Sequence, residues 1–165
     1  MFSTSQLIRR IVQTSGSELA TVDGERQQTW HQYMDKLARF AGGLQSLGVN
    51  DGDCVAMMAL NSDRYFEFMY GVPWAGGVFQ PINTRLAGPE VVYWLNDSEA
   101  KVLLVDSTFV PLIQQIRSEL NYVEHFIFVD QSATPDGYSS YDSLVDNTPV
   151  ADAGRKNDDI AALFY

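Results

Sequence analysis

The sequence is poor in cysteine, histidine and basic residues. Its 165 residues include one cysteine and two histidines, and 11 basic against 21 acidic residues give a formal net charge of −10. A single cysteine excludes an internal disulfide framework and fits a reducing compartment, which predicts a cytoplasmic location. The basic residues are scattered, whereas phosphate neutralisation needs clustered lysine and arginine. We therefore expect no nucleic-acid partner.

Long apolar runs are also absent. No run reaches the roughly 18 residues that a transmembrane helix needs, and no basic region precedes an apolar core as in a secretory signal. Residues 1–17 are rich in Ser and Thr, contain Arg9 and Arg10 and carry no acid, as in mitochondrial transit peptides. We favour a simpler interpretation, a short helix with one buried face. That face comprises Leu7, Ile8, Ile11 and Val12.

Helix signals are strong in the first third of the chain. Capping-box spacing joins Ser3 to Gln6 and Thr29 to Gln32. After Thr29, apolar residues recur at spacings of three and four, as in a helix packed on one face. They are Trp30, Tyr33, Met34, Leu37, Phe40, Ala41, Leu44 and Leu47. Gly48 is expected to end this helix in the left-handed conformation.

A small hairpin is predicted between these two helices. Asp23-Gly24 separates residues 19–22 from residues 26–28, and such a pair favours a tight turn between strands.

From Asn50 onward the pattern changes to strands that alternate with helices. The expected strands are residues 54–60, 78–82, 101–106, 125–130 and 160–165. The expected helices are residues 64–74, 88–95 and 108–120, with a helical turn at 141–145, a loop at 131–140 and a polar connection at 146–159. Near-continuous apolar strands between helices predict an α/β fold with a mostly parallel sheet covered by helices on both faces.

Two predicted strands end in an aspartate, Asp106 and Asp130. Carboxylates at the carboxyl ends of parallel strands lie where α/β folds bind ligands, so magnesium binding or phosphoryl acceptance is one interpretation. We favour the other, in which each carboxylate caps the following turn through backbone N–H groups. A phosphoacceptor site also needs further acids and a basic residue, and none is evident.

The remaining reactive side chains indicate no catalytic centre. His31 and His125 have no Cys, Asp or Glu at metal-ligand spacing, so we predict structural or surface roles and no metal site. Cys54 lies in an apolar run and is expected to be a buried hydrophobic residue. No nucleotide-binding glycine loop is present.

Arg85 is the one candidate for substrate binding. It follows the second expected strand in the polar cluster Asn83-Thr84-Arg85, at the carboxyl edge of the sheet. It is suited to a ligand carboxylate or phosphate, but we favour a buried arginine that ties loop carbonyls together. No catalytic or cofactor-binding residue is assigned.

Several stretches, in order and spacing, resemble the N-terminal region of the adenylate-forming acyl-CoA synthetases. They are Thr29-Trp30, Gly48-Val49 before Gly52-Asp53, and Gly71-Val72-Pro73-Trp74-Ala75-Gly76-Gly77 leading to Pro81-Ile82-Asn83-Thr84-Arg85-Leu86. The run from Glu90 to Leu112 is similar to the fatty-acyl and medium-chain branch in particular. The resemblance extends from about Leu7 to Tyr165.

The resemblance implies a parent enzyme that joins a carboxylate to CoA through an acyl-adenylate, with ATP, CoA and magnesium as cofactors. In that family a Ser/Thr/Gly-rich phosphate loop ending in Gly and Lys would begin directly after Tyr165. The loop, the later magnesium-handling acid, the ribose-binding Asp, the acyl pocket and the C-terminal domain are not among residues 1–165. This implies a scaffold segment that is inactive and binds no cofactor by itself.

The chain ends inside an expected strand, residues 160–165, without a turn or polar tail. We therefore expect residues 1–165 to be a single partial α/β domain, the incomplete N-terminal part of a larger domain. Its partner is the remainder of the parent, and exposed apolar surface favours self-association. The alternative is a non-catalytic α/β regulatory or interaction domain, with Asp106 or Asp130 as a modified or ligand-sensing residue.

Overall fold

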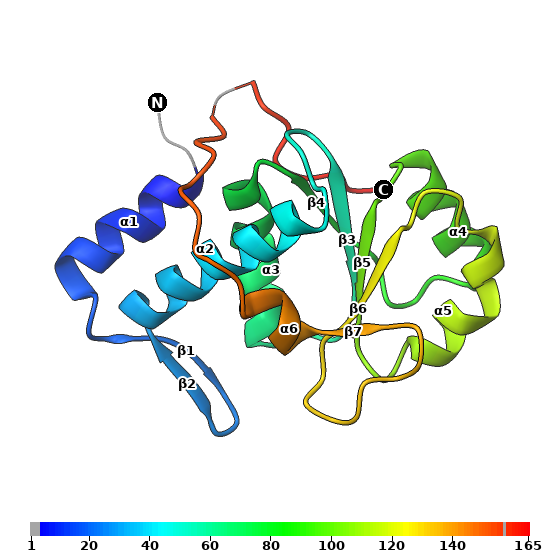
Figure 1. The fold of residues 1–165 in the computed structure, drawn as a ribbon, viewed down its shortest axis with the longest axis horizontal. Coiled ribbons are helices and arrows are strands. Elements are labelled where there is room, and N and C mark those ends of the chain that lie inside the picture. The colour runs from blue at the N-terminus through cyan, green and yellow to red at the C-terminus, as the bar shows by residue number, and fades with distance from the viewer. Residues whose placement is uncertain (1–3, 157) are drawn as a thin grey trace.

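A parallel sheet forms the centre of the molecule in the computed structural model, which describes residues 4–156 and 158–165 (Figure 1). The order of its strands is β4-β3-β5-β6-β7, and every neighbouring pair is parallel. The strands are β3 (Cys54–Met58), β4 (Val78–Pro81), β5 (Val102–Val105), β6 (His125–Phe128) and β7 (Ser139–Ser140). The chain leaves β3 for β4 on one side and returns to β5 on the other.

Helices cover both faces of the sheet, as Figure 1 shows. One face carries α1 (Thr4–Ser15), α2 (Trp30–Ser46), α3 (Asp63–Ala75) and α6 (Tyr141–Val145). The other carries α4 (Gly88–Asp97) and α5 (Val110–Ile116), which continues into a short 3-10 turn, η1 (Arg117–Glu119). The predicted α/β class, with a parallel sheet between two helical layers, is confirmed.

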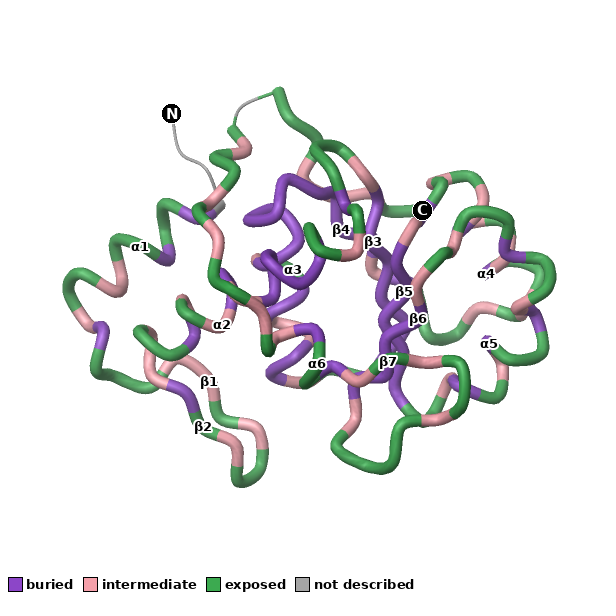
Figure 2. The backbone as a smooth tube through the Cα atoms, viewed as in Figure 1, coloured by how far each residue is buried: buried purple, intermediate pink, exposed green. Residues whose placement is uncertain are grey.

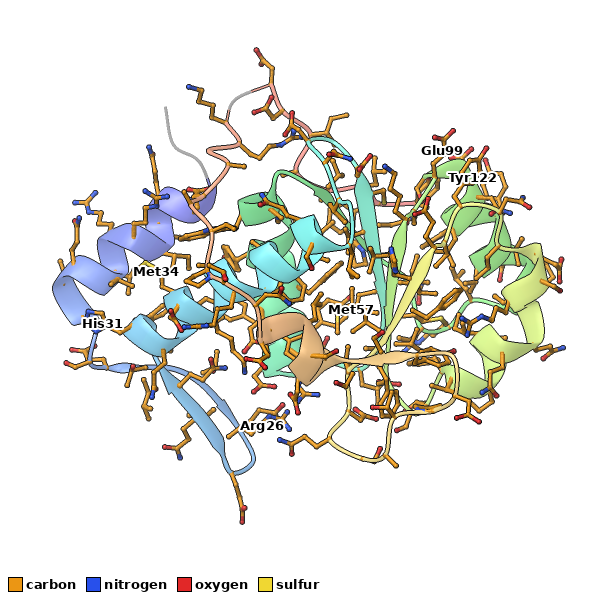
Figure 3. All side chains as sticks on the ribbon, in the orientation of Figure 1. Arg26, His31, Met34, Met57, Glu99 and Tyr122 are labelled. Atoms are coloured by element: carbon orange, nitrogen blue, oxygen red, sulfur yellow. The ribbon has the colours of Figure 1, made fainter. Side chains whose placement is uncertain are left out.

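Alternation along β3 divides the core between the two layers. Val55 and Met57 pack on the α2 and α3 side, whereas Ala56 and Met58 pack on the α4 and α5 side. All four side chains are buried, as expected for a central parallel strand. Figure 2 shows the continuous buried backbone through the sheet, and Figure 3 places Met57 near the centre of the molecule.

The predicted hairpin is formed by β1 (Leu19–Asp23) and β2 (Arg26–Thr29), which pair antiparallel. Gly24 in its turn has φ of +59°, a conformation that favours glycine. Arg26 reaches from the hairpin toward the body of the molecule (Figure 3) and donates to both carboxylate oxygens of Asp63 at 2.9 and 2.8 Å. The hairpin is therefore tied to the first turn of α3.

The capping box predicted at Thr29 is confirmed. The backbone N–H of Gln32 donates to the Thr29 hydroxyl at 3.4 Å, and the backbone N–H of Thr29 donates to the Gln32 amide oxygen at 2.9 Å. These bonds satisfy two N–H groups that a helix start leaves without partners.

Two adjacent glycines let α6 and the polar connection lie directly on α2. A Cβ atom on Gly42 would stand 2.2 Å from the Thr148 carbonyl oxygen, and one on Gly43 would stand 2.1 Å from that of Leu144. Residues 146–156 cross the helical layer here, and the N–H of Val150 donates to the Ala38 carbonyl oxygen at 3.1 Å. We call residues 146–156 the strap.

The prediction of a regular strand at residues 160–165 is wrong. Only a single parallel bridge joins Ala162 to Phe79 on the free edge of β4. The two neighbouring positions on that edge offer no donor, because Pro81 has no N–H group and the N–H of Gly77 is bonded to the Val72 carbonyl. Residues 160–165, here called the edge segment, therefore lie beside β4 without a full ladder.

Other boundaries differ by a few residues. The helix expected at 108–120 ends at Ile116, and the last turn tightens into η1. The loop expected at 131–140 contains the two-residue strand β7, which extends the sheet beyond β6.

Candidate functional site

A hollow of about 300 Å³ lies at the carboxyl ends of β3 and β4. It is lined by Ala59, Asn61, Tyr65, Pro81, Ile82, Asn83, Thr84, Trp94, Phe164 and Tyr165. The connection from β3 runs to β4 and that from β5 runs to β6 on the opposite side, and ligands of open α/β sheets bind at the carboxyl ends of the strands. We therefore take this hollow, the edge hollow, as the candidate site.

The edge segment forms the aromatic wall of the hollow. The ring of Tyr165 stacks on Trp94 with centroids 5.1 Å apart and planes at 25°. Its hydroxyl donates to Asp97 Oδ2 at 2.7 Å. Burial and the adjacent Asp97 carboxylate raise the pKa of the Tyr165 hydroxyl to about 12. Phe164 meets Phe79 edge to face at 6.2 Å, so both terminal aromatic residues are anchored to neighbouring elements.

The polar wall comes from the loops after β3 and β4. Asn83 accepts a hydrogen bond from the backbone N–H of Arg85 through Oδ1 at 3.0 Å, a local turn that orients the loop. Asn61 and Thr84 contribute an amide and a hydroxyl to the lining. Side chains of this kind, beside aromatic faces, are suited to a ligand with both polar and planar parts.

Arg85 is not the buried arginine that we favoured from the sequence. Its side chain is exposed, and it makes no hydrogen bond or ion pair with the residues that the structure describes. The loop turns through Asn83 instead, so the guanidinium is not needed to satisfy buried carbonyls. Arg85 therefore lies free in solvent directly beside two residues that line the edge hollow.

Asp106 is a capping residue, as we favoured, whereas Asp130 binds the loop after β5 rather than the turn that follows its own strand. Asp106 is buried and accepts from the backbone N–H groups of Leu60 and Thr108 at 2.6 and 2.9 Å. Asp130 accepts from the backbone N–H of Ser107 at 2.8 Å. These bonds join the loops that follow β3, β5 and β6, so the carboxylates hold the carboxyl edge together.

The histidines and the cysteine take structural positions. His31 lies at the start of α2 (Figure 3), and its backbone N–H donates to the Gly16 carbonyl at 2.9 Å. His125 begins β6. Cys54 is buried in β3, and burial raises the pKa of its thiol to about 11, which disfavours the thiolate. Across residues 4–156 and 158–165, no group of three His, Cys, Asp or Glu could hold a metal ion.

A buried polar network surrounds Glu67, and we did not expect it from the sequence. This carboxylate is fully buried in α3 and accepts from Gln28 Nε2 at 2.6 Å, from Lys36 Nζ at 3.1 Å and from the Tyr141 hydroxyl. Burial and the adjacent Glu67 charge raise the pKa of Tyr141 well above its ordinary value. The network joins the hairpin, α2, α3 and α6, so it stabilises the helical layer.

A sequence signal for this network exists in the spacing of α3. Glu67, Gly71 and Trp74 follow one another at four and three residues and share the buried face of the helix. An acid on a largely buried helix face requires partners, since burying an unpaired carboxylate is energetically unfavourable.

No helix within the described part of the chain is long and apolar enough to cross a membrane.

Comparison with known proteins gives consistent matches. The chain matches the family model described as AMP-binding enzyme over residues 8–165. It is 41% identical over 117 residues to the long-chain-fatty-acid–CoA ligase of Thermus thermophilus, an alignment that covers 71% of this chain and 21% of that protein. It is 34% identical over 141 residues to the 3-methylmercaptopropionyl-CoA ligase of Ruegeria pomeroyi, covering 82% of this chain and 26% of that protein.

Solved structures agree with these matches. The crystal structure of an anthranilate CoA ligase in complex with anthranoyl-AMP superimposes with a TM-score of 0.92 at 28% identity, covering 98% of this chain and 31% of that one. The chain thus spans about a fifth to a third of the length of these similar proteins.

Proposed function

The chain belongs to the AMP-binding enzyme family, and on this premise we propose that it is the N-terminal scaffold segment of an ATP-dependent acyl-CoA synthetase. The observation that carries the proposal is the match of residues 8–165 to this family, supported by the superposition on an acyl-CoA ligase. Residues 1–165 then form one part of a larger adenylate-forming domain.

The proposed parent reaction has two steps. A carboxylate oxygen attacks the α-phosphate of ATP, which forms an acyl-adenylate and releases pyrophosphate. The CoA thiol then attacks the acyl carbonyl, the thiol proton is lost, and AMP leaves. Both steps rely on positioning and on stabilisation of developing negative charge.

The described residues contribute scaffold rather than metal ligands. Asp106 and Asp130 already accept backbone hydrogen bonds, and no cluster of three metal-ligating side chains forms among these residues. This donor set does not fit a magnesium site, so we assign magnesium, ATP and CoA chemistry to other parts of the parent. The carboxyl edge supports that centre through the capped loops after β3, β5 and β6.

A fatty acid is the substrate class that we propose for the parent, on the similarity to a long-chain-fatty-acid–CoA ligase. We propose a role in fatty acid metabolism and a cytoplasmic location on the same basis, together with the single buried thiol of Cys54.

A pyrophosphate-release assay tests this proposal. The 165-residue chain, given ATP, CoA and fatty acids of graded length, is expected to show no turnover above a no-enzyme control. A longer reading frame that begins with these residues is expected to release pyrophosphate with at least one acid. Turnover that purifies with the 165-residue chain would contradict the scaffold assignment.

The codons after Tyr165 separate this proposal from the regulatory alternative. A Ser/Thr/Gly-rich loop followed by a lysine supports the synthetase. A stop codon or a Lys/Arg-rich tail favours a regulatory or interaction domain.

We further propose that Arg85 contacts an anionic group of a parent substrate, a carboxylate or a phosphate. Its guanidinium is exposed beside the edge hollow and has no partner among the described residues. Arg85→Met is expected to leave the melting temperature of the chain unchanged and to raise a substrate KM of the parent. A lower melting temperature with an unchanged KM would restore the structural interpretation.

A further inference from the structure

The edge segment is held by few ladder bonds, yet it forms a wall of the edge hollow. Its backbone joins β4 only through Phe79, whose N–H donates to the Ala161 carbonyl and whose carbonyl accepts from the Leu163 N–H, each at 3.0 Å. Since Pro81 and Gly77 offer no further donors, two bonds alone do not fix the direction of the segment.

Arg155 supplies an additional anchor at the start of this segment. Its guanidinium donates through Nη2 to the Ile160 carbonyl oxygen at 2.7 Å and through Nη1 to Asp51 Oδ1 at 2.7 Å. The planar fork therefore bridges the turn before β3 and the edge segment. The Arg155 side chain is only 10% exposed, whereas that of Asp51 is 78% exposed.

The bonds at Nη1 and Nη2 hold the Arg155 side chain in a largely buried position. Its Nε atom is buried and has no hydrogen-bond partner in the described structure. An unpaired buried N–H is unfavourable, so the conformation must be compensated by the bonds at Nη1 and Nη2.

Hydrogen bonds to α1 and α3 hold the strap in place directly before Arg155. The N–H of Ala153 donates to the Trp74 carbonyl at 2.9 Å, and Asp152 accepts from Arg9 at 3.0 Å and from the hydroxyl of Ser5. Gly154 has φ of +74°, which turns the chain directly before Arg155. The arginine thus extends from a segment that is bonded to α1 through the Asp152 side chain and to α3 through the backbone of Ala153.

We propose that Arg155 is a positioning residue that holds the edge segment against β4 and thereby places Phe164 and Tyr165 as the wall of the edge hollow. Its relevance to catalysis rests on the proposed function, whereas its effect on the segment does not. No hydrogen bond or ion pair among the described residues joins Arg155 to the lining; it acts through the Ile160 carbonyl, and the ring of Tyr165 stacks on Trp94.

Hydrogen exchange on the intact 165-residue chain tests this role. In Arg155→Gln, the amides of Phe79 and Leu163 are expected to exchange at least about tenfold faster, because both bonds join β4 to the edge segment. The ring protons of Tyr165 are expected to lose the upfield NMR shift that stacking on Trp94 produces. The amides of Leu103 and Leu104 in β5 are expected to keep their protection.

Arg39 of α2, which binds the same strap, provides a matched control. It also bridges a carboxylate and a backbone carbonyl, donating to Asp35 Oδ2 at 2.8 Å and to the Asn147 carbonyl at 3.2 Å. Arg39→Gln is expected to leave the exchange of Phe79 and Leu163 unchanged. Unchanged exchange in Arg155→Gln, or an equal acceleration in Arg39→Gln, would overturn the positioning role.

A second variant covers the case in which Arg155→Gln does not fold. Asp51→Asn changes a largely exposed side chain and weakens only the ion pair, so the same two amides are expected to accelerate by a smaller factor. No effect there, with β5 still protected, counts against the proposal. Neither measurement involves catalysis. If the unmodified parent releases no pyrophosphate while the exchange results are as expected, the proposed function alone is refuted.

Discussion

At the scale of single residues, the partners of buried polar atoms determine which substitutions matter. Tyr141 and Tyr138 form a matched pair, because the hydroxyl of Tyr141 donates to the buried Glu67 whereas the buried hydroxyl of Tyr138 has no partner among the described residues. Tyr141→Phe is expected to lower the unfolding free energy by about 1–3 kcal/mol, since it leaves a buried carboxylate short of a donor. Tyr138→Phe is expected to be neutral or stabilising.

Urea denaturation of the two variants, followed by circular dichroism, measures this difference. Equal effects of the two variants would show that the hydrogen bond from Tyr141 to Glu67 contributes no specific stability to α6.

The Arg26–Asp63 pair predicts a pH dependence of stability. Burial opposes ionisation of Asp63, but the hydrogen bonds and charge of Arg26 prevail and lower the pKa of its carboxyl group. A carboxyl group with a lowered folded pKa contributes stability above its unfolded pKa of about 4 and loses it as the pH falls through the folded value. Unfolding free energy is therefore expected to decrease below about pH 4.

Asp63→Asn isolates this contribution. At pH 7 the variant is expected to be less stable than the unmodified chain by about 1.5–3 kcal/mol, the usual value of a hydrogen bond to a charged group. Below about pH 4 its stability is expected to depend less on pH. Thermal unfolding at pH 3, 4 and 7 measures both effects. An unchanged pH profile would assign the acid sensitivity to other carboxylates.

The role of a single residue is predictable from the sequence when its partners lie nearby in the chain. The capping roles of Thr29 and of Asp106 depend on neighbours within three residues or on a strand end, and both were predictable. The free state of Arg85 depends on a turn made by Asn83, so the burial that we expected was wrong. Glu67 finds partners 39 and 74 positions away, and no local pattern specifies them.

At the scale of elements, α2 contains a pair of adjacent glycines. Their replacement by alanine is expected to lower stability, although helix propensity alone predicts a gain. An alanine in place of glycine stabilises an exposed helix by up to about 1 kcal/mol. At Gly42 the added Cβ would stand 2.2 Å from a strap carbonyl, so backbone must move. Gly42→Ala is expected to destabilise the chain by about 1–2 kcal/mol, because overpacking exceeds the gain in propensity.

Chemical denaturation of Gly42→Ala checks this expectation. A stabilised variant would show that the strap is displaced from α2 at little cost in free energy.

Helices and strands are predictable from the periodicity of their apolar residues. The exceptions depend on which segments find hydrogen-bond partners in the sheet. Strands β3, β4, β5 and β6 and the helices between them were predictable within a few residues, because apolar runs and glycine or proline boundaries are local, whereas β7 lies in an expected loop. The edge segment has the apolar pattern of a strand but lacks partners on β4, where Pro81 and Gly77 supply no donor. The carboxyl edge was predictable as the location of a candidate site, whereas the aromatic wall of the edge hollow was not.

At the scale of the whole molecule, apolar side chains remain exposed along the edge segment. Phe164 is 74% exposed and Ile160 is 58% exposed, beside the free edge of β4. Such a surface favours association at a sheet edge, so we expect the chain to self-associate as its concentration rises. Sedimentation velocity over a concentration series measures this.

Two matched variants locate the surface. Phe164→Asp is expected to reduce self-association, whereas Val22→Asp, at a hairpin residue that is 61% exposed, is expected to leave it unchanged. A chain that stays monomeric at high concentration would refute the expectation, and a reduction by Val22→Asp alone would assign the interface to the hairpin.

The anchoring of α1 to Asp152 has a consequence for the order of folding. Ser5 and Asp152 are separated by 147 positions, so this contact closes nearly the whole chain into one loop. Contacts of such sequence separation form late, because the loop entropy is lost before the contact contributes. On the ribosome, the contact between α1 and Asp152 therefore cannot form until residue 152 is synthesised. Pulsed hydrogen labelling during refolding is expected to protect β3 and β5 before α1, and early protection of α1 would contradict this order.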